Sequence, residues 1–399
     1  MFSNRTRWSL APNALHRAFL ARAGRPLLDL TVSTPTAAGL SFPNPEALRA
    51  ALASPPVLEY HPSPFGTLAA REALTTWFST HGLQTSPERL CLTASTSEAY
   101  AFLFKLLCNP GETVLVPAPS YPLFDFLAEL EGVVLQTYPL RYDGELHVDL
   151  AWLEAALRKA SAPRAIVTIH PNNPTGSYLQ PEELDAIAER CAQHGLALIS
   201  DEVFYEHRLR DTARPAPRAA TRTDCLSFSL GGLSKLVGLP QIKLGWIAVN
   251  GPKQLREEAL ARLEIVADTY LSVSTPAQLA LPIALANADA AVHAIRDRLL
   301  TNLARLDAAI ADSAWTRLRL DGGWAAVLRL PATRSSEGWA LRFLSAADVL
   351  VQPGYFYGLG AEDTDAYVGL SLLCATTPFS AGVAAAVAAT GSDAGAAVP

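Results

Sequence analysis

The feature that most constrains the fold is a regular alternation of short apolar runs and helical patterns through the middle of the chain. Helical patterns such as Ser97–Leu107 and Pro181–His194 separate the apolar runs. Strands that alternate with helices favour a mostly parallel sheet in an α/β domain, where ligands bind at the carboxyl ends of the strands. Six runs are predicted to be buried strands: Leu90–Thr93, Val114–Val116, Val133–Tyr138, Ala165–Ile169, Leu196–Ser200 and Cys225–Ser229.

The pattern changes after about residue 285. A smaller α+β domain is expected over residues 286–399, with residues 1–45 contributing to it and residues 46–285 forming the large domain. The last part of the chain is predicted to hold a long amphipathic helix, two short strands and an apolar helix, at Ala291–Ala311, Ala325–Leu330, Tyr367–Leu373 and Ser380–Ala389.

Composition narrows the classes of partner. A net charge of −6 without any Lys/Arg-rich run argues against a nucleic-acid partner. No apolar run reaches the roughly 20 residues that span a bilayer, and residues 1–26 lack the pattern of a signal peptide. The scattered cysteines form neither a C-x-x-C pair nor a metal-ligand spacing, so reduced thiols and no metal site are expected. We therefore expect a cytoplasmic protein without membrane contact.

Lysine is scarce, and two of the five lysines, Lys235 and Lys243, lie in the segment SLGGLSKLVGLPQIKLGWIAV. This segment is predicted to be a glycine-rich turn between two apolar strands. Glycine lets the backbone approach a ligand closely, and a lysine held in such a turn can be desolvated into a nucleophilic amine. A plain connection between strands is the alternative.

Polar residues follow two of the predicted strands. The loop His170–Gly176, HPNNPTG, comes directly after Ala165–Ile169 and can hold the Asn173 amide toward a ligand, although Asn, Pro and Gly also form ordinary turns. Asp201 ends the apolar strand Leu196–Ser200. A carboxylate is costly to bury unless it meets a cation, which is either a ligand or a structural ion-pair partner.

The segment Thr93–Glu98 joins a predicted strand to a predicted helix. Ser95 with Glu98 fits a capping box. The free N–H groups of the first helical turn, with the hydroxyls of Ser95, Thr96 and Ser97, also suit a phosphate group. The two interpretations are compatible.

Together these segments supply an amine, a carboxylate for a pyridinium nitrogen, an amide for a phenolate oxygen and a phosphate cradle, which are the needs of pyridoxal phosphate. With HPNNPTG, SDEVF and LSK-x₇-K, the chain resembles the fold-type I pyridoxal-phosphate enzymes, specifically the class I/II aminotransferases of the aspartate aminotransferase superfamily. The resemblance runs from LDLTVSTPT, near residue 28, to Tyr367–Leu373. It implies a large domain with a mostly parallel central sheet and a smaller α+β domain.

The resemblance also implies roles for single residues. Lys235 forms the Schiff base with the cofactor and then moves the proton at the substrate Cα. Asp201 pairs with the pyridine nitrogen, Asn173 bonds the 3′ oxygen and Tyr121, in APSYPLF, stacks on the ring. Thr96 and Ser97 hold the phosphate.

Two more residues are implied to contact phosphate. Tyr60 matches a tyrosine that reaches the phosphate in the neighbouring subunit, which implies a homodimer with shared active sites. Lys243 stands where relatives place a phosphate-binding arginine, so we expect it to act there as a point charge.

The chain departs from the family at three positions. Phe204 stands where many relatives have a tyrosine that bonds the 3′ oxygen, and Tyr205 or another donor would have to supply the missing hydroxyl. Gly232 replaces a phosphate-binding Ser or Thr. The arginine that binds the substrate carboxylate aligns with Gly369, or with Val368 if the register slips.

The last arginine of the chain is Arg342, so either another arginine binds the substrate carboxylate or the substrate is held differently. Tyr270 and the stretch Ser33–Pro35 are further candidates for the substrate pocket.

The resemblance implies an aminotransferase that moves an amino group from an amino acid to a 2-oxo acid. The missing arginine keeps a pyridoxal-phosphate-dependent lyase, decarboxylase or oxidase open as the alternative. A hydrolase without this cofactor is disfavoured, since the chain has no G-x-S-x-G, Walker or H-E-x-x-H motif.

Overall fold

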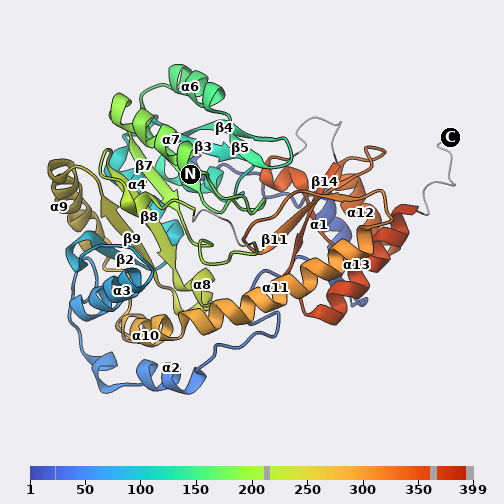
Figure 1. Ribbon diagram of the computed structural model, residues 1–399, viewed down its shortest axis with the longest axis horizontal. Coiled ribbons are helices and arrows are strands. Elements are labelled where there is room, and N and C mark those ends of the chain that lie inside the picture. Colours follow the sequence, from blue (N-terminus) through green and yellow to red (C-terminus); the bar gives the residue numbers. More distant parts are fainter. Residues whose placement is uncertain (23, 211–215, 360–365, 392–399) are drawn as a thin grey trace.

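The computed structural model describes residues 1–22, 24–210, 216–359 and 366–391 (Figure 1). Its centre is an eight-stranded sheet in the order β2-β9-β8-β7-β6-β3-β4-β5. The strands from β8 to β4 in this order run parallel to one another, whereas β9 and β5 are antiparallel to their neighbours. The strands are β2 (Leu90–Thr93), β3 (Thr113–Ala118), β4 (Val134–Tyr142), β5 (Leu146–Val148), β6 (Pro163–Ile169), β7 (Ala197–Asp201), β8 (Ser227–Gly232) and β9 (Gly245–Asn250). A mostly parallel sheet is thus confirmed, and all six predicted strands are present.

Side chains alternate between the two faces of this sheet, and each face has its own core. Val114 and Val116 of β3 pack in one core, while Leu115 packs in the other. The Val114 face is covered by α4 (Thr96–Leu107), α5 (Phe124–Glu131) and α9 (Lys253–Tyr270), and the Leu115 face by α6 (Leu150–Lys159) and α7 (Pro181–His194). A third core near β2 and β9 includes residues of α2 (Pro45–Leu52), α3 (Leu68–Thr80) and α10 (Thr275–Ala286).

The segment that contains Lys235 differs from the predicted glycine-rich turn. Strand β8 extends through Gly231 and Gly232, and Lys235 lies in the short helix α8 (Leu233–Leu236). A Cβ at Gly231 would overlap the indole of Trp246 on β9, so the glycine lets these two strands pair closely. The prediction of a turn was therefore wrong for residues 231–236.

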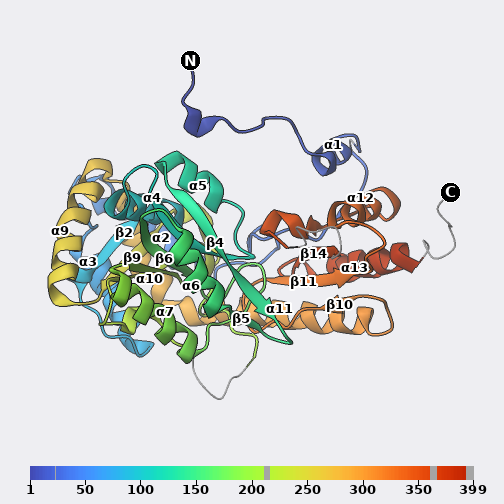
Figure 2. The same cartoon turned by 90° about the horizontal axis from the view of Figure 1, so that it is seen from above.

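A second, antiparallel sheet lies beside the first, in the order β10-β11-β14-β13. Its strands are β10 (Thr316–Arg317), β11 (Ala325–Leu330), β14 (Ala366–Ser371) and β13 (Gln352–Pro353). The helices α11 (Ala288–Ile310), α12 (Ser336–Ala346) and α13 (Thr376–Gly391) pack around it (Figures 1 and 2).

The N-terminal segment joins this smaller unit. Strand β1 (Leu28–Asp29) pairs in parallel with β12 (Val349–Leu350), and α1 (Ala14–Leu20) lies against α12 (Figure 2). Helix α11 connects the two units, because Ala291 packs in the core near β2 while Ile295 packs in the core of the smaller unit. The predicted boundaries after residues 45 and 285 stay a prediction.

Within the described residues, no single helix is both long and apolar enough to cross a membrane. Only α10 and α11 taken together, across a bend of 69°, meet the criteria of length and composition.

Candidate active site

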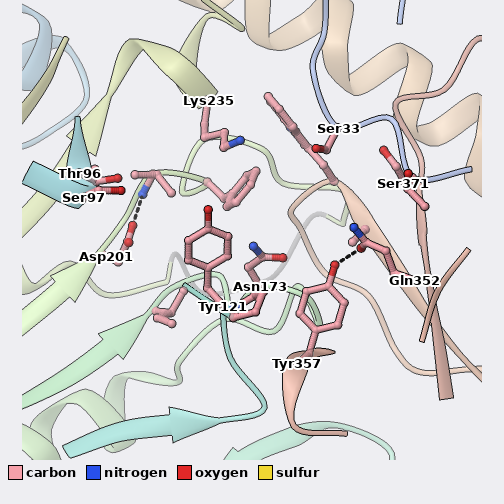
Figure 3. A pocket seen from close by; sticks show the side chains of 17 residues that line it. Ser33, Thr96, Ser97, Tyr121, Asn173, Asp201, Lys235, Gln352, Tyr357 and Ser371 are labelled. Carbon is pink, nitrogen blue, oxygen red and sulfur yellow. Dashed lines mark hydrogen bonds between the residues drawn. The ribbon is translucent and has the colours of Figure 1, made fainter. Parts of the chain in front are cut away.

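A cavity of about 260 Å³ lies between the large sheet and the smaller unit (Figure 3). Several of its residues stand at the carboxyl ends of parallel strands, where α/β sheets bind ligands. Six of the predicted site residues line it: Thr96, Ser97, Tyr121, Asn173, Asp201 and Lys235. Ser95, Lys243 and Tyr60 do not line it.

Lys235 is half-buried on α8 and directs its amine into the cavity (Figure 3). Its Nζ lies 5.1 Å from the ring centroid of Trp324 and 5.5 Å from that of Phe204. Burial lowers the pKa of Lys235 below its usual value, and the charge of Asp201 opposes this shift. The buried ring of His207 donates from Nε2 to the backbone carbonyl of Lys235 at 2.8 Å, which anchors the lysine backbone.

Asp201 ends β7 beside Ile169 of β6 and Leu230 of β8. Burial raises the pKa of its carboxyl to about 6, while hydrogen bonds and the Lys235 charge act in the opposite direction. Its oxygens accept from the Val203 N–H at 3.2 Å and from the Tyr100 hydroxyl at 3.1 Å. The sequence interpretation missed Tyr100, although its position one helical turn after Thr96 places both residues on the same side of α4.

The side chain of Asn172 fixes the HPNNPTG loop through hydrogen bonds within the loop and to the neighbouring Pro119. The Asn172 amide donates to the Pro119 carbonyl at 3.0 Å, and its Oδ1 accepts from the Thr175 hydroxyl at 2.8 Å. Gly176 has a φ of 68°, and a Cβ there would overlap the Gly322 carbonyl oxygen. This frame leaves the next residue, Asn173, half-buried with its side chain in the cavity (Figure 3).

The N-terminus of α4 combines a cap with an anion-binding geometry. The Ser95 hydroxyl accepts from the Glu98 N–H at 3.1 Å, and the Glu98 carboxylate accepts from the Ala94 N–H at 2.7 Å. The cap thus has the predicted Ser95–Glu98 partners, but the carboxylate reaches back to Ala94. Ser95 serves the helix and stays outside the cavity, whereas Thr96 and Ser97 offer hydroxyls and first-turn N–H groups to it.

Lys243 and Tyr60 lie away from the cavity within this chain. Lys243 is exposed just before β9, with a left-handed φ of 58°. Tyr60 is 77% exposed and lines a separate groove of about 170 Å³, together with Leu271. Their predicted contacts with phosphate stay predictions.

The structure explains two of the departures from the family pattern. Phe204 lines the cavity and packs edge-on against Trp324, with ring centroids 5.2 Å apart. Tyr205 does not replace the missing hydroxyl, because its own hydroxyl donates to the Ala216 carbonyl at 2.6 Å. A Cβ at Gly232 would lie 3.2 Å from Cα of Gly245, so the absence of a side chain there serves the close pairing of β8 with β9.

The side of the cavity formed by the smaller unit and the N-terminal segment carries residues that the sequence interpretation largely missed. Ser33 was a candidate and lines the cavity, whereas Tyr270 lies on α9 outside it. The missed residues are Thr31, Trp324, Ala325, Gln352, Tyr357 and Ser371. No arginine stands among the described residues that line the cavity.

Comparisons with known proteins identify the family of this chain. The sequence profile of "Aminotransferase class I and II" matches residues 25–371. The glutamate-pyruvate aminotransferase AlaA of Escherichia coli K12 is 30% identical over 267 residues, which are 67% of this chain and 65% of that protein. The match therefore spans less than two thirds of that relative's length. The alanine aminotransferase of Mycobacterium tuberculosis is 28% identical over 76% of this chain and 69% of its own.

Solved structures show the same fold. An aminotransferase from Escherichia coli superposes with a TM-score of 0.84 at 24% identity, covering 96% of each chain. The alanine aminotransferase from Pyrococcus furiosus also reaches 0.84, at 21% identity, with 96% of this chain and 98% of that chain covered. The family profile over most of the sequence, the shared fold and the motifs at the strand ends establish that this chain belongs to the class I and II aminotransferases of the aspartate aminotransferase superfamily.

Proposed function

We propose that this chain is a pyridoxal-phosphate-dependent aminotransferase. It moves an amino group from a donor such as an amino acid to the carbonyl group of an acceptor such as a 2-oxo acid. The main support for the proposal is that an amine, a carboxyl, an amide and two hydroxyls from separate segments of the chain line one cavity. These residues are Lys235, Asp201, Asn173, Thr96 and Ser97.

The donor set supports the fit of pyridoxal phosphate. The hydroxyls of Thr96 and Ser97 at the N-terminus of α4 suit its phosphate. The Asp201 carboxyl is buried with only partial compensation, as its raised pKa of about 6 indicates, and it would gain a partner in a protonated ring nitrogen. Tyr121 and Asn173 would contact the ring face and the phenolic oxygen.

When bound, pyridoxal phosphate supplies an aldehyde that reacts with amines and a ring that takes up electrons from the bond that breaks. Lys235 contributes an amine whose pKa is lowered by burial, so that it can act as a nucleophile and carry a proton at the substrate Cα. Asp201 would hold the ring nitrogen in its protonated form. His207 fixes the Lys235 backbone, which limits where the amine can move.

Absorbance tests the cofactor, and product analysis tests the reaction. The purified protein with pyridoxal phosphate should absorb at about 400–430 nm, and Lys235→Ala should lose this band. In a single turnover, formation of pyridoxamine phosphate with one equivalent of carbonyl product supports amino transfer. Release of ammonia or carbon dioxide instead would favour a lyase or decarboxylase, and consumption of oxygen an oxidase. A protein that takes up no pyridoxal phosphate would contradict the proposal.

We also propose a homodimer with shared active sites. Apolar and aromatic side chains that line the groove of Tyr60 are exposed, including Tyr60 itself at 77% and Leu271 at 39%. Contact with a second copy would cover them. Light scattering tests the assembly. A Tyr60→Phe variant should dimerise normally but bind pyridoxal phosphate more weakly if this hydroxyl reaches the partner's phosphate.

We propose a cytoplasmic location as well. The five cysteines are unpaired, and four of them are buried, as expected of a protein in a reducing compartment. Cell fractionation tests this proposal.

A further inference from the structure

The cavity has two chemically different walls (Figure 3). Thr96, Ser97 and Asp201 lie on one side, where the cofactor is proposed to bind. Ser33, Gln352, Tyr357 and Ser371 lie on the other side, which we call the neutral wall together with Thr31. Among the described residues that line the cavity, Lys235 is the only lysine or arginine.

The hydroxyls of the neutral wall mostly use their protons within the protein. Thr31 donates to the Asp29 carboxylate at 2.6 Å, Ser371 donates to the Val32 carbonyl at 2.5 Å, and Tyr357 donates to Oε1 of Gln352. The oxygens of Thr31 and Tyr357 are therefore left as hydrogen-bond acceptors, whereas that of Ser371 already accepts from the Leu373 N–H at 3.3 Å. Within the described residues, the Gln352 NH₂ group donates to no protein atom, so it offers a donor beside these acceptors.

A wall that mainly accepts hydrogen bonds matches a ligand that can donate. A hydroxyl or a carboxamide both donates and accepts, whereas a carboxylate only accepts. A carboxylate against this wall would face the lone pairs of Thr31 and Tyr357 and could be bound only by two uncharged donors, the Gln352 amide and the Ser33 hydroxyl.

Relatives carry an arginine at the position of Gly369, and here Tyr357 of the neutral wall lies next to this position. Val368 and Leu370 of β14 pack in the core, so Gly369 faces the other side of the strand, as does Ser371 in the cavity. A Cβ at Gly369 would lie 3.4 Å from Cε2 of Tyr357. This is ordinary van der Waals contact, so the Tyr357 ring borders the space that a longer side chain would enter. Burial raises the pKa of the Tyr357 hydroxyl to about 12 and so keeps it protonated.

The charges of the cavity also disfavour a substrate carboxylate. Asp201 contributes a carboxylate that would pair with the protonated ring nitrogen, and the phosphate of the proposed cofactor would add negative charge. A substrate carboxylate would be a further anion in a partly desolvated site, and burying it without a paired cation is costly.

We propose that the preferred substrate carries an uncharged hydrogen-bonding group, hydroxymethyl or carboxamide, where an amino acid carries its carboxylate. The substrate is thus a 2-amino alcohol or an amino acid amide. The Gln352 NH₂ group donates to its oxygen, and the oxygens of the neutral wall accept its proton. This inference rests on the proposed aminotransferase function.

Three ligands that differ only in this group test the inference by binding alone. They are 2-amino-2-methylpropan-1-ol, 2-aminoisobutyramide and 2-aminoisobutyrate. None has a hydrogen on the amine-bearing carbon, so amino transfer that begins with removal of this hydrogen cannot follow, and the shift of the visible band of the holoenzyme reports binding. At equal concentrations of unprotonated amine, the alcohol or the amide should bind about 10- to 100-fold more tightly than the carboxylate. Single turnovers with alaninol, alaninamide and alanine should follow the same order.

Variants of the neutral wall test whether its residues cause the preference for neutral ligands. The double variant Gly369→Arg, Tyr357→Ala places a cation where the ring stood and should reverse the preference toward the carboxylate. The matched control Gly369→Met, Tyr357→Ala has a side chain of similar length without charge and should not reverse it. Gln352→Leu should weaken binding of the alcohol and the amide by about 10-fold but leave binding of 2-methylbutan-2-amine, in which a methyl group replaces the hydroxyl, unchanged.

Binding of the carboxylate by the wild-type holoenzyme as tightly as the neutral ligands would overturn the inference, whether or not the variants fold. In that case the visible band and amino transfer from alanine would still uphold the proposed function. A protein without the visible band would overturn both. Comparing the affinity for the alcohol with that for the amide shows which neutral group is preferred.

Discussion

The hydroxyl of Tyr100 on α4 lies 3.1 Å from Oδ2 of Asp201 at the end of β7. This hydrogen bond joins the helix that carries Thr96 and Ser97 to the carboxylate that would meet the cofactor ring. Because the bond favours the ionised form, it lowers the pKa of Asp201, although burial keeps the pKa raised to about 6.

Tyr100→Phe should therefore raise the pKa of Asp201. A hydrogen bond to a charged group contributes about 1.5 kcal/mol or more, so we expect an increase of about one pKa unit. Carbon-13 NMR of aspartate-labelled apoprotein measures the titration, and Asp201→Asn assigns the resonance. Tyr138→Phe is the control, since that buried hydroxyl donates to the Val167 carbonyl at 2.7 Å. An unchanged Asp201 pKa in Tyr100→Phe would contradict the prediction.

Asp201→Asn should stabilise the apoprotein at neutral pH. Burial raises the folded pKa of Asp201 from 3.8 to about 6, so the unfolded chain releases this proton first and stability falls as pH rises from about 4 to 6. The variant avoids this loss, with a gain of up to about 3 kcal/mol at pH 8 and none below pH 4. Urea unfolding across this pH range measures it. A variant less stable than wild type at pH 8 would show that Asp201 serves stability, contrary to this prediction.

His207 should make the protein less stable in acid. Burial lowers its folded pKa from 6.5 to about 4, so the unfolded chain binds the proton first and stability falls as pH decreases from about 6.5 to 4. His207→Phe should make this fall less steep. It should also cost about 1–3 kcal/mol at pH 8, because the Lys235 carbonyl loses its donor. Unfolding titrations at several pH values measure both effects. An unchanged slope between pH 6.5 and 4 would refute the assignment to His207.

Gly176→Ala should destabilise the protein far more than Gly195→Ala. Both glycines have left-handed φ angles, 68° and 64°, so both variants incur a similar backbone cost of about 1 kcal/mol. A Cβ at Gly176 would in addition overlap the Gly322 carbonyl oxygen, whereas nothing lies within 4 Å of one at Gly195. We expect a further loss of about 2 kcal/mol or more, measured by denaturant unfolding. Equal losses would mean that the HPNNPTG loop can move away from Gly322.

Local patterns sufficed for most of the secondary structure. The bounds of β2, α7 and β11 agree with the prediction to the residue, because apolar periodicity and end signals such as Pro181 and Gly195 act over a few neighbouring residues. The prediction was wrong at residues 231–236. There the contact of Gly231 with Trp246, a neighbour only across the sheet, keeps the chain extended through Gly232.

The cavity brings Lys235, Asp201 and Asn173 together as the motifs predicted, since strands in one parallel sheet end at one edge. Tyr100 was missed because its contact with Asp201 joins residues 101 positions apart. Gln352 and Tyr357 were missed because they lie in no motif and reach the cavity only when the smaller unit packs against the large sheet.

The sequence by itself determined the α/β pattern, the family and the residues suited to pyridoxal phosphate, because these depend on local periodicity and on short motifs. Only the tertiary structure decided that Ser95 stays outside the cavity, that Tyr205 donates elsewhere and that Tyr357 lies beside Gly369. Hydrogen-bond partners and occupied space depend on residues far apart in the chain. For the same reason, the charge of the cavity, and with it the proposed substrate class, could be inferred only after folding had brought its walls together.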